Sequence, residues 1–267
     1  PESEVTLADC ELQNWQNVRP CFVLSTGRSG TLLLNQLLQL SPAAAAHHQP
    51  SPELIRASKR AYEEIRQSPE VFCEVLKSAR EELILQAAQR NKVYIETNNR
   101  ITFFAPVIPD VFPQAVFIHL TRHPGAFVRS GIRRRWYSGK HEHDVGRPEP
   151  LEPEMKTKWK QFTQVEKIGW LWNETNRFIE DFKKEVNPER VLQIKAENLF
   201  SDPQTTEKIF AFLHLPPISR QRIAKKLKTP VNVQKKGEFP KYSDWPPEIK
   251  EQLRKVVPIA SRYGYSL

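Results

Sequence analysis

Short apolar runs alternate along the chain with longer segments whose apolar residues recur at helical spacing. The first run, residues 21–24, has the length and character of a buried parallel strand, and a leucine-rich helix follows it over 32–38. Further apolar and β-branched runs predict strands at 92–96, 115–120 and 190–194. Strands separated by helices are typical of an α/β fold with a doubly wound parallel sheet, which binds ligands at the carboxyl ends of its strands.

The segments between these strands predict helical insertions within a single domain over 1–267. A charged helical pattern over 53–89 is interrupted by a proline, so we expect a pair of helices there, and a long amphipathic helix is expected over 159–185. Residues 138–158 are polar and rich in proline, and such a long irregular segment predicts a mobile loop or lid. Residues 1–19 are interpreted as a short leader to the first strand.

Composition and charge narrow the class of protein. The 267-residue chain is 39% hydrophobic and 10% aromatic, as expected of a soluble globular domain, and no apolar run approaches the ~18 residues of a membrane span. The beginning lacks a signal-peptide pattern and the three cysteines have no metal or disulfide spacing, so we expect a cytoplasmic protein. The His-Glu-His-Asp cluster at 141–144 is interpreted as a solvated loop, and no metal site is predicted. The net charge of +9 predicts an anionic partner, but without a nucleic-acid-binding motif we expect none of that class.

The turn after the first predicted strand carries residues suited to binding an anion. It contains Gly27 and Gly30 and opens a helix, so backbone N–H groups and the positive end of the helix dipole converge on one spot. Arg28 adds a cation there, and Ser29 and Thr31 add hydroxyl donors. The alternative is an ordinary strand-to-helix turn, in which the glycines serve only the backbone conformation.

A second anion site is expected at the end of the strand over 115–120. Arg122 offers a fork of donors, and Ser130 offers a hydroxyl from the helix that follows. Each residue alone has an ordinary alternative, a surface ion pair for the arginine and a solvent-facing helix position for the serine. Two such sites at strand ends of one sheet make these ordinary alternatives less favoured.

These motifs resemble those of the sulfotransferases that use 3′-phosphoadenosine-5′-phosphosulfate (PAPS). Residues 23–31 are similar to that family's 5′-phosphosulfate loop, 117–130 to its 3′-phosphate motif, 191–203 to its strand with Glu-x-Leu and Asp-Pro, and 235–237 to a basic Lys-Gly segment. The resemblance implies a three-layer, P-loop-like α/β fold with a central parallel sheet and helical insertions. It implies transfer of the sulfuryl group from PAPS to a hydroxyl, less readily an amine, with adenosine 3′,5′-bisphosphate as product. The donor-binding residues that it implies are Gly27, Arg28, Ser29, Gly30, Thr31, Leu32, Arg122, Ser130, Lys235, Lys236 and Gly237.

The resemblance also implies catalytic roles. Arg28 is expected at the bridging oxygen, where the leaving phosphate gains negative charge. The general base is not settled, because some members carry Glu at the position that Gln49 occupies here. A histidine near neutral pH is a competent base, and a carboxylate is another. The candidates are His48 with its neighbour His47, Glu53 in the same loop, and Glu96 at the end of the second predicted strand.

Two other classes of protein compete with this interpretation. A nucleotide kinase needs a lysine after the second glycine of its phosphate loop and a strand-borne Asp for Mg²⁺, and the sequence shows neither. A nucleotide-binding protein without catalysis would fit the glutamine at position 49. The acceptor is expected to be a small molecule, a lipid or a glycan. The residue that stacks on the adenine is not evident, because Ala196 replaces an aromatic residue of the family, and the oligomeric state is not indicated.

Overall fold

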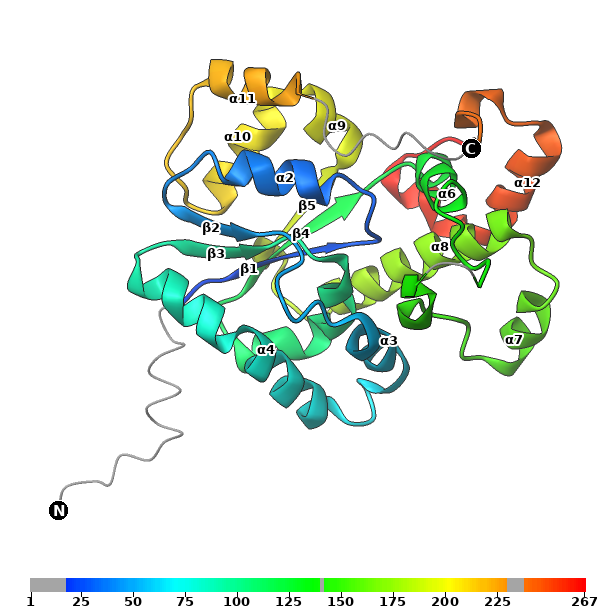
Figure 1. Ribbon diagram of the computed structural model, residues 1–267, viewed down its shortest axis with the longest axis horizontal. Helices are drawn as coiled ribbons and strands as arrows, with labels where there is room; N and C mark the ends of the chain where they lie inside the picture. Colours follow the sequence, from blue (N-terminus) through cyan, green and yellow to red (C-terminus); the bar gives the residue numbers. More distant parts are fainter. Residues whose placement is uncertain (1–17, 140–141, 230–237) are drawn as a thin grey trace.

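The computed structural model describes residues 18–139, 142–229 and 238–267 of the chain (Figure 1). Its centre is a five-stranded sheet in the order β2-β3-β1-β4-β5, in which every neighbouring pair is parallel. The first strand of the sequence is therefore central, and its carboxyl end lies beside that of β4. The strands are β1 (Cys21–Ser25), β2 (Ala44–His47), β3 (Val93–Glu96), β4 (Val116–Thr121) and β5 (Val191–Lys195).

Each face of the sheet has its own apolar core, and the alternation of side chains along β1 divides the two. Cys21 and Val23 belong to one buried cluster, and Phe22 and Leu24 belong to the other. The first cluster includes residues of α2 (Thr31–Leu38), α9 (Ala196–Ser201), α10 (Pro203–Phe212) and α11 (Arg220–Leu227). The second includes residues of α3 (Ile55–Glu64), α4 (Pro69–Gln89), η1 (Asn99–Val107) and α8 (Gln164–Lys183). The two helical layers with the sheet between them confirm the predicted α/β fold (Figure 1).

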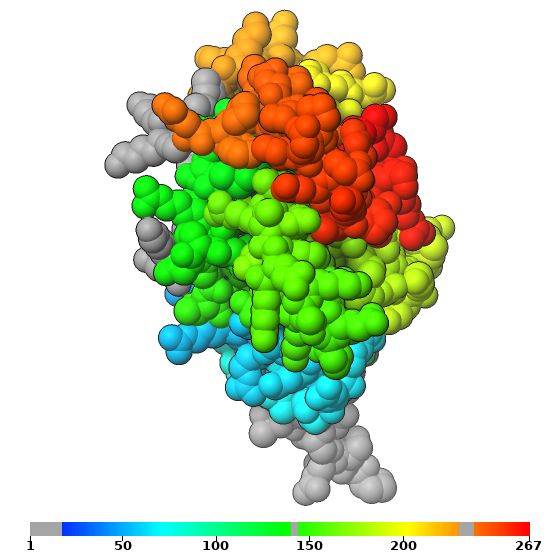
Figure 2. Space-filling model, turned by 90° about the vertical axis from the view of Figure 1, so that its right-hand side faces the viewer, coloured from blue at the N-terminus to red at the C-terminus, as the bar shows by residue number. Residues whose placement is uncertain are grey.

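Helix α8 organises one flank of the molecule. It packs against α6 (Pro124–Ile132) and α12 (Pro247–Val256), and Figure 2 shows the segments of α7, α8 and α12 together on that flank. None of the helices in the described ranges is both long and apolar enough to cross a membrane. The remaining short elements are α5 (Ile108–Val111), η2 (Glu142–Gly146), α7 (Pro153–Trp159), η3 (Pro188–Arg190), η4 (Tyr242–Asp244) and η5 (Pro258–Tyr263).

The four strands that the sequence predicts are confirmed, and the sheet contains a fifth. The sequence predicts no strand at β2, because alanine fills three of its four positions and has little preference for strands. It pairs only with β3, and the backbone N–H of Thr97 donates to the carbonyl oxygen of His47 at its end (2.9 Å). Pairing with a neighbour, which a local pattern does not encode, makes this segment a strand.

Two helical expectations differ from the structure. The helix expected over 159–185 begins later, at Gln164, because Thr163 and Glu166 form a capping box that fixes a new start. Residues 142–158 contain the short helices η2 and α7 rather than a wholly irregular segment, and their function as a lid stays a prediction. Helices α9 and α11 were not predicted, whereas the pair of helices over 53–89 is confirmed as α3 and α4.

Candidate active site

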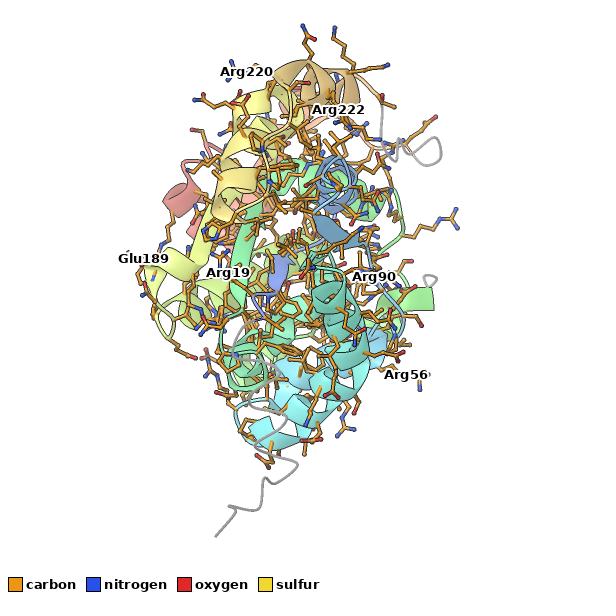
Figure 3. All side chains as sticks on the ribbon, turned by 90° about the vertical axis from the view of Figure 1, so that its left-hand side faces the viewer. Arg19, Arg56, Arg90, Glu189, Arg220 and Arg222 are labelled. Atoms are coloured by element: carbon orange, nitrogen blue, oxygen red, sulfur yellow. The ribbon has the colours of Figure 1, made fainter. Side chains whose placement is uncertain are left out.

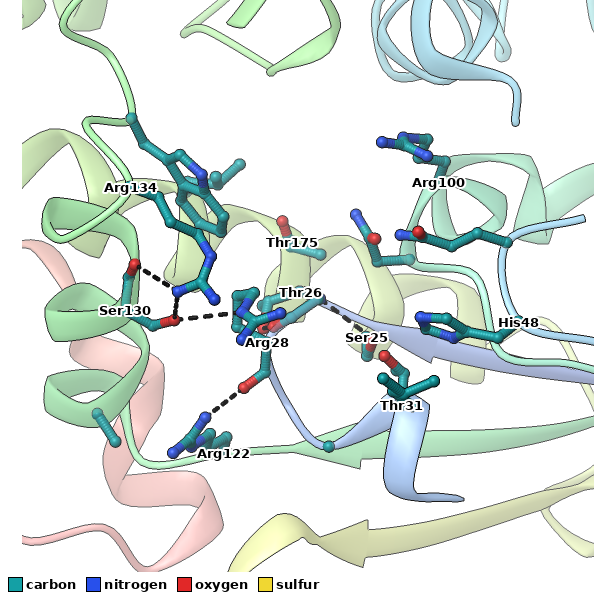
Figure 4. A pocket seen from close by; sticks show the side chains of 18 of the residues that line it. Ser25, Thr26, Arg28, Thr31, His48, Arg100, Arg122, Ser130, Arg134 and Thr175 are labelled. Atoms are coloured by element: carbon teal, nitrogen blue, oxygen red, sulfur yellow. Dashed lines mark hydrogen bonds between the residues drawn. The ribbon is translucent and has the colours of Figure 1, made fainter. Parts of the chain in front are cut away.

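A cavity of about 630 Å³ lies at the carboxyl ends of β1 and β4 (Figure 4). Parallel strands present their carboxyl ends at one edge, so residues that follow different strands in the sequence meet there. The predicted site residues that the structure brings to this cavity are Gly27, Arg28, Gly30, Thr31, Leu32, His48, Arg122 and Ser130.

The turn between β1 and α2 has the conformation of an anion cradle. Gly27, Arg28 and Gly30 all have positive φ angles, of 73°, 53° and 91°, which fold the chain back over the end of the strand. A Cβ atom at Gly30 would lie 2.5 Å from the ring of Phe200, so this position has no room for a side chain. Helix α2 begins directly after it, and the N–H groups of its first turn have no partner within the helix.

Ser29 differs from its predicted role as a hydroxyl donor to the ligand. Its side chain is completely buried beneath the turn, where the hydroxyl donates to the carbonyl oxygen of Gly27 (3.0 Å) and lies 3.1 Å from the hydroxyl of Thr26. The hydroxyl therefore does not line the cavity, and it stabilises the shape of the turn instead. The reason is the backbone path, since the positive φ of Arg28 turns the next side chain inward.

Two guanidinium groups donate to Ser130, and a third contacts the backbone of the neighbouring turn. Its hydroxyl oxygen accepts from Nε of Arg28 (3.2 Å) and Nη1 of Arg134 (2.9 Å), and Nη1 of Arg122 donates to the carbonyl oxygen of Arg28 (Figure 4). Because guanidinium groups only donate, the hydroxyl hydrogen of Ser130 is left to serve a further acceptor. Burial lowers the pKa of Arg28 to about 10, and the charges of Arg134 and Arg122 act in the same direction. An anion bound between these groups would relieve their mutual repulsion.

The positive charge of the chain is divided between the surface and this cavity. Arg56, Arg90, Arg220 and Arg222 are exposed, and the last two lie together on α11, away from Arg56 and Arg90 (Figure 3). Among the described residues that line the cavity there are no aspartates, glutamates or lysines. The arginines that line it are Arg28, Arg100, Arg122, Arg129, Arg133, Arg134 and Arg147.

His48 follows β2 and reaches the cavity from the side opposite Ser130 (Figure 4). Its Nδ1 lies 3.0 Å from the hydroxyl oxygen of Thr97, and that hydroxyl donates its own hydrogen to the carbonyl oxygen of His47 (3.3 Å). Thr97 therefore accepts from Nδ1–H of His48, which leaves the lone pair on Nε2. Burial lowers the pKa of His48 below its usual 6.5, and the charges of Arg28 and Arg100 act in the same direction. The ring is thus neutral and able to take a proton near pH 7.

Glu96 was a candidate base, and the structure contradicts that role. Its carboxylate is completely buried and accepts from Nε and Nη2 of Arg80 (2.6 and 2.9 Å), from the hydroxyl of Tyr94 (2.9 Å) and from the amide of Asn98 (3.0 Å). It does not line the cavity. A carboxylate with four donors and no access to a ligand is a structural group, and here it joins β3 to α4.

The other two candidates also lie outside the cavity lining. Glu53 forms an ion pair with Nη1 of Arg100, and its side chain is 46% exposed. His47 stacks on the ring of Tyr94, with the ring centroids 5.2 Å apart. His47 is the last residue of β2 and directly precedes His48. Because successive side chains of a strand point to opposite faces, His47 points away from the cavity. His48 is therefore the candidate that the geometry supports.

Lys235, Lys236 and Gly237 lie outside the described residues, so their predicted contact with the 3′-phosphate stays a prediction. The sequence interpretation missed Thr97 and Phe200, which lie within the polar turn after β3 and the segment after β5. Thr97 could have been found as a hydroxyl directly after a strand end. Phe200 had no local signal, because its contact with Gly30 depends on how α9 packs on the sheet.

The cavity, the cradle and the parallel sheet define an α/β protein with a cavity suited to an anionic ligand. Comparison with known proteins identifies the class, because residues 20–219 match the model of the sulfotransferase family. The chain belongs to this family. A search of curated protein sequences finds no match.

Solved structures agree on the fold at low sequence identity. The sulfotransferase domain of the curacin biosynthetic pathway superposes with a TM-score of 0.57 at 16% identity, covering 94% of this chain and 99% of that one. A sulfotransferase from Alicyclobacillus acidocaldarius gives 0.55 at 16% identity, covering 94% and 98%. The sulfotransferase domain of the Synechococcus PCC 7002 olefin synthase gives 0.52 at 18% identity, covering 94% and 98%. The likeness covers nearly the whole chain and concerns the fold.

Proposed function

We propose that this protein transfers a sulfuryl group from PAPS to a hydroxyl group of an acceptor. The observation that carries the proposal is the joining of two anion sites in one cavity. Arg28 belongs to the cradle after β1, and its side chain reaches Ser130, which belongs to the site after β4. A nucleotide with a 5′-phosphosulfate and a 3′-phosphate has two anionic groups that suit this pair of sites.

The donor would bind through both sites. Backbone N–H groups of Gly30 and Thr31, with the dipole of α2, suit the 5′-phosphosulfate. Arg122 and the hydroxyl hydrogen of Ser130 suit the 3′-phosphate, and Arg134 adds a cation that already touches this hydroxyl.

Phe200 is the aromatic side chain suited to the adenine. It lines the cavity beside the cradle, and the guanidinium carbon of Arg122 lies 5.4 Å from its ring centroid. It would replace the family's aromatic residue, whose position Ala196 occupies.

The transfer step needs a base on one side of the sulfur and a cation on the other. PAPS supplies the sulfuryl group, whose sulfur bonds to the acceptor oxygen as its bond to the bridging phosphate oxygen breaks. Nε2 of His48 takes the proton of the acceptor hydroxyl. Arg28 stabilises the negative charge that develops on the bridging oxygen, and adenosine 3′,5′-bisphosphate is the leaving group. Figure 4 shows Arg28 between Ser130 and His48, an arrangement that would let His48 act on the acceptor while Arg28 contacts the bridging oxygen.

The proposal is tested with labelled PAPS and a broad pool of hydroxyl acceptors. We expect transfer of label without added Mg²⁺, and none with Arg28→Ala. Tight binding of PAPS with no transfer to any acceptor would favour a nucleotide-binding protein without catalysis. Stabilisation by ATP that depends on Mg²⁺, with no effect of adenosine 3′,5′-bisphosphate, would favour a kinase. No observation in the described cavity favours the kinase, because no lysine lines it.

A further inference from the structure

The part of the cavity beyond Arg28 and His48 combines apolar walls with two arginines. We propose that it binds an amphiphilic acceptor, a hydroxylated molecule with an apolar body and one oxyanion, a carboxylate or a phosphate, held between Arg100 and Arg147. This inference rests on the proposed function and names the class of acceptor that the site takes.

The walls of this part are apolar side chains from three separate elements. Ile55 comes from α3, Phe103 from η1 and Leu171 from α8, and Trp136 adds an indole ring. Phe103, Leu171 and Trp136 are only 5 to 6% exposed, and all three line the cavity. Contact with an apolar surface removes such walls from water and stabilises the complex. Apolar walls form no hydrogen bonds with the hydroxyl-rich surface of a glycan.

Arg100 and Arg147 are the charged groups of this part. Their side chains are 11% and 12% exposed, and Glu53 is a carboxylate partner of Arg100, as Asp144 is of Arg147 (2.8 Å). Burial lowers the pKa of Arg147, the hydrogen bond to Asp144 opposes this shift, and the positive charge of Arg100 adds to the effect of burial. Both guanidinium groups line the same cavity, so together they suit one oxyanion. No carboxylate lines the described cavity wall, so the wall itself does not repel an anion.

The structure holds Arg147 in place before any acceptor arrives. Its guanidinium carbon lies 4.2 Å from the ring centroid of Trp136, a stacked arrangement that a planar guanidinium favours. The neighbouring Gly146 lies so close to α3 that a Cβ atom there would be 2.5 Å from the carbonyl oxygen of Ile55. On the other side, the hydroxyl of Tyr137 donates to the carbonyl oxygen of Pro148 (2.7 Å). A fixed cation binds an anion without paying the entropy of ordering its side chain.

The test uses three matched acceptors with labelled PAPS: a medium-chain ω-hydroxy acid, its methyl ester, and the corresponding ω-hydroxyalkyl phosphate. We expect the wild-type protein to favour at least one of the two anions over the ester by about tenfold in kcat/KM, the effect of one charge-assisted hydrogen bond. The carboxylate and phosphate arms decide which oxyanion the site prefers. In Arg147→Gln and Arg100→Gln we expect a raised KM for the anions and an unchanged KM for the ester.

A matched control is Arg56→Gln, which removes an exposed arginine outside the cavity lining. This variant should change neither the KM for the anions nor the KM for the ester. Stabilisation by adenosine 3′,5′-bisphosphate shows that each variant is folded with an intact donor site. Equal use of ester and anions by the wild-type protein would overturn the inference, as would equal loss of both in the variants or sulfation of none of the three. If the bisphosphate does not bind the wild-type protein, the proposed function itself fails.

Discussion

The two sides of the cavity differ in how the chain builds them. The donor side, where we propose that PAPS binds, consists of two contiguous stretches, the turn 26–30 after β1 and the segment 122–134 after β4, each following a central strand. The acceptor side, where we propose that the acceptor binds, combines single residues from α3, η1, α8 and the loops after β2 and α6. A contiguous stretch fixes its own geometry through local backbone conformation, whereas a collected surface depends on packing between distant elements. The donor side is therefore the half of the site that is easier to predict from the sequence.

The largest effect on kcat is expected at Arg28, the residue of the donor side that we place at the bridging oxygen. Arg28→Ala removes the cation at the bridging oxygen, and we expect kcat to fall on the order of 1000-fold. Arg28→Lys keeps a charge and should retain more activity than the alanine variant. Rates measured with saturating labelled PAPS check this, and a loss below tenfold would show that the cradle catalyses without this side chain.

Glu96 tests whether a buried carboxylate near the acceptor side has a structural function rather than a catalytic one. Glu96→Gln leaves the guanidinium of Arg80 buried without its charged partner, and we expect the free energy of unfolding to fall by about 3 kcal/mol. Denaturant titration measures this change. The kcat of the folded variant should stay near the wild-type value, and a hundredfold loss of kcat with unchanged stability would return Glu96 to the role of base.

His48 tests the chemistry of the acceptor side. His48→Ala should lower kcat by about 100-fold while binding of adenosine 3′,5′-bisphosphate stays unchanged. His47→Ala is the matched control, since that ring lies outside the cavity lining and its folded variant should keep the wild-type kcat.

The dependence of kcat on pH is a second test of His48 as the general base. The reaction needs the neutral ring, and burial lowers the pKa of His48 below 6.5, so kcat should stay level at neutral pH and fall only on the acid side of 6.5. The fall should be absent from the residual activity of His48→Ala. A fall that begins above pH 7 would point to a different base.

Thr97 should give the smallest of these effects. Thr97→Val removes the oxygen that accepts from Nδ1–H of His48, and we expect kcat to fall about tenfold with little change in KM. Thr97→Ser keeps the hydroxyl and should restore kcat, whereas a loss that serine does not restore would indicate packing alone.

The same contrast explains how far the sequence could predict the molecule. Strands β1, β3, β4 and β5 are apolar runs with local signals, and the cradle and the Arg122–Ser130 pair follow two of them, so all could be predicted. Strand β2 could not, because three alanines become a strand only by pairing with β3. Ser29 and Glu96 have suitable chemistry for a site, but both side chains are buried. The conformation of the turn buries Ser29, and packing of β3 against α4 buries Glu96.

The central claim is that one nucleotide occupies both anion sites of the donor side. Calorimetric titration in the presence of EDTA, with adenosine 3′,5′-bisphosphate and with adenosine 5′-monophosphate, tests it most directly. We expect the bisphosphate to bind about 100-fold more tightly, because only it has a phosphate for Arg122 and Ser130. Equal affinity for the two nucleotides, or binding that requires Mg²⁺ and ATP, would contradict the claim.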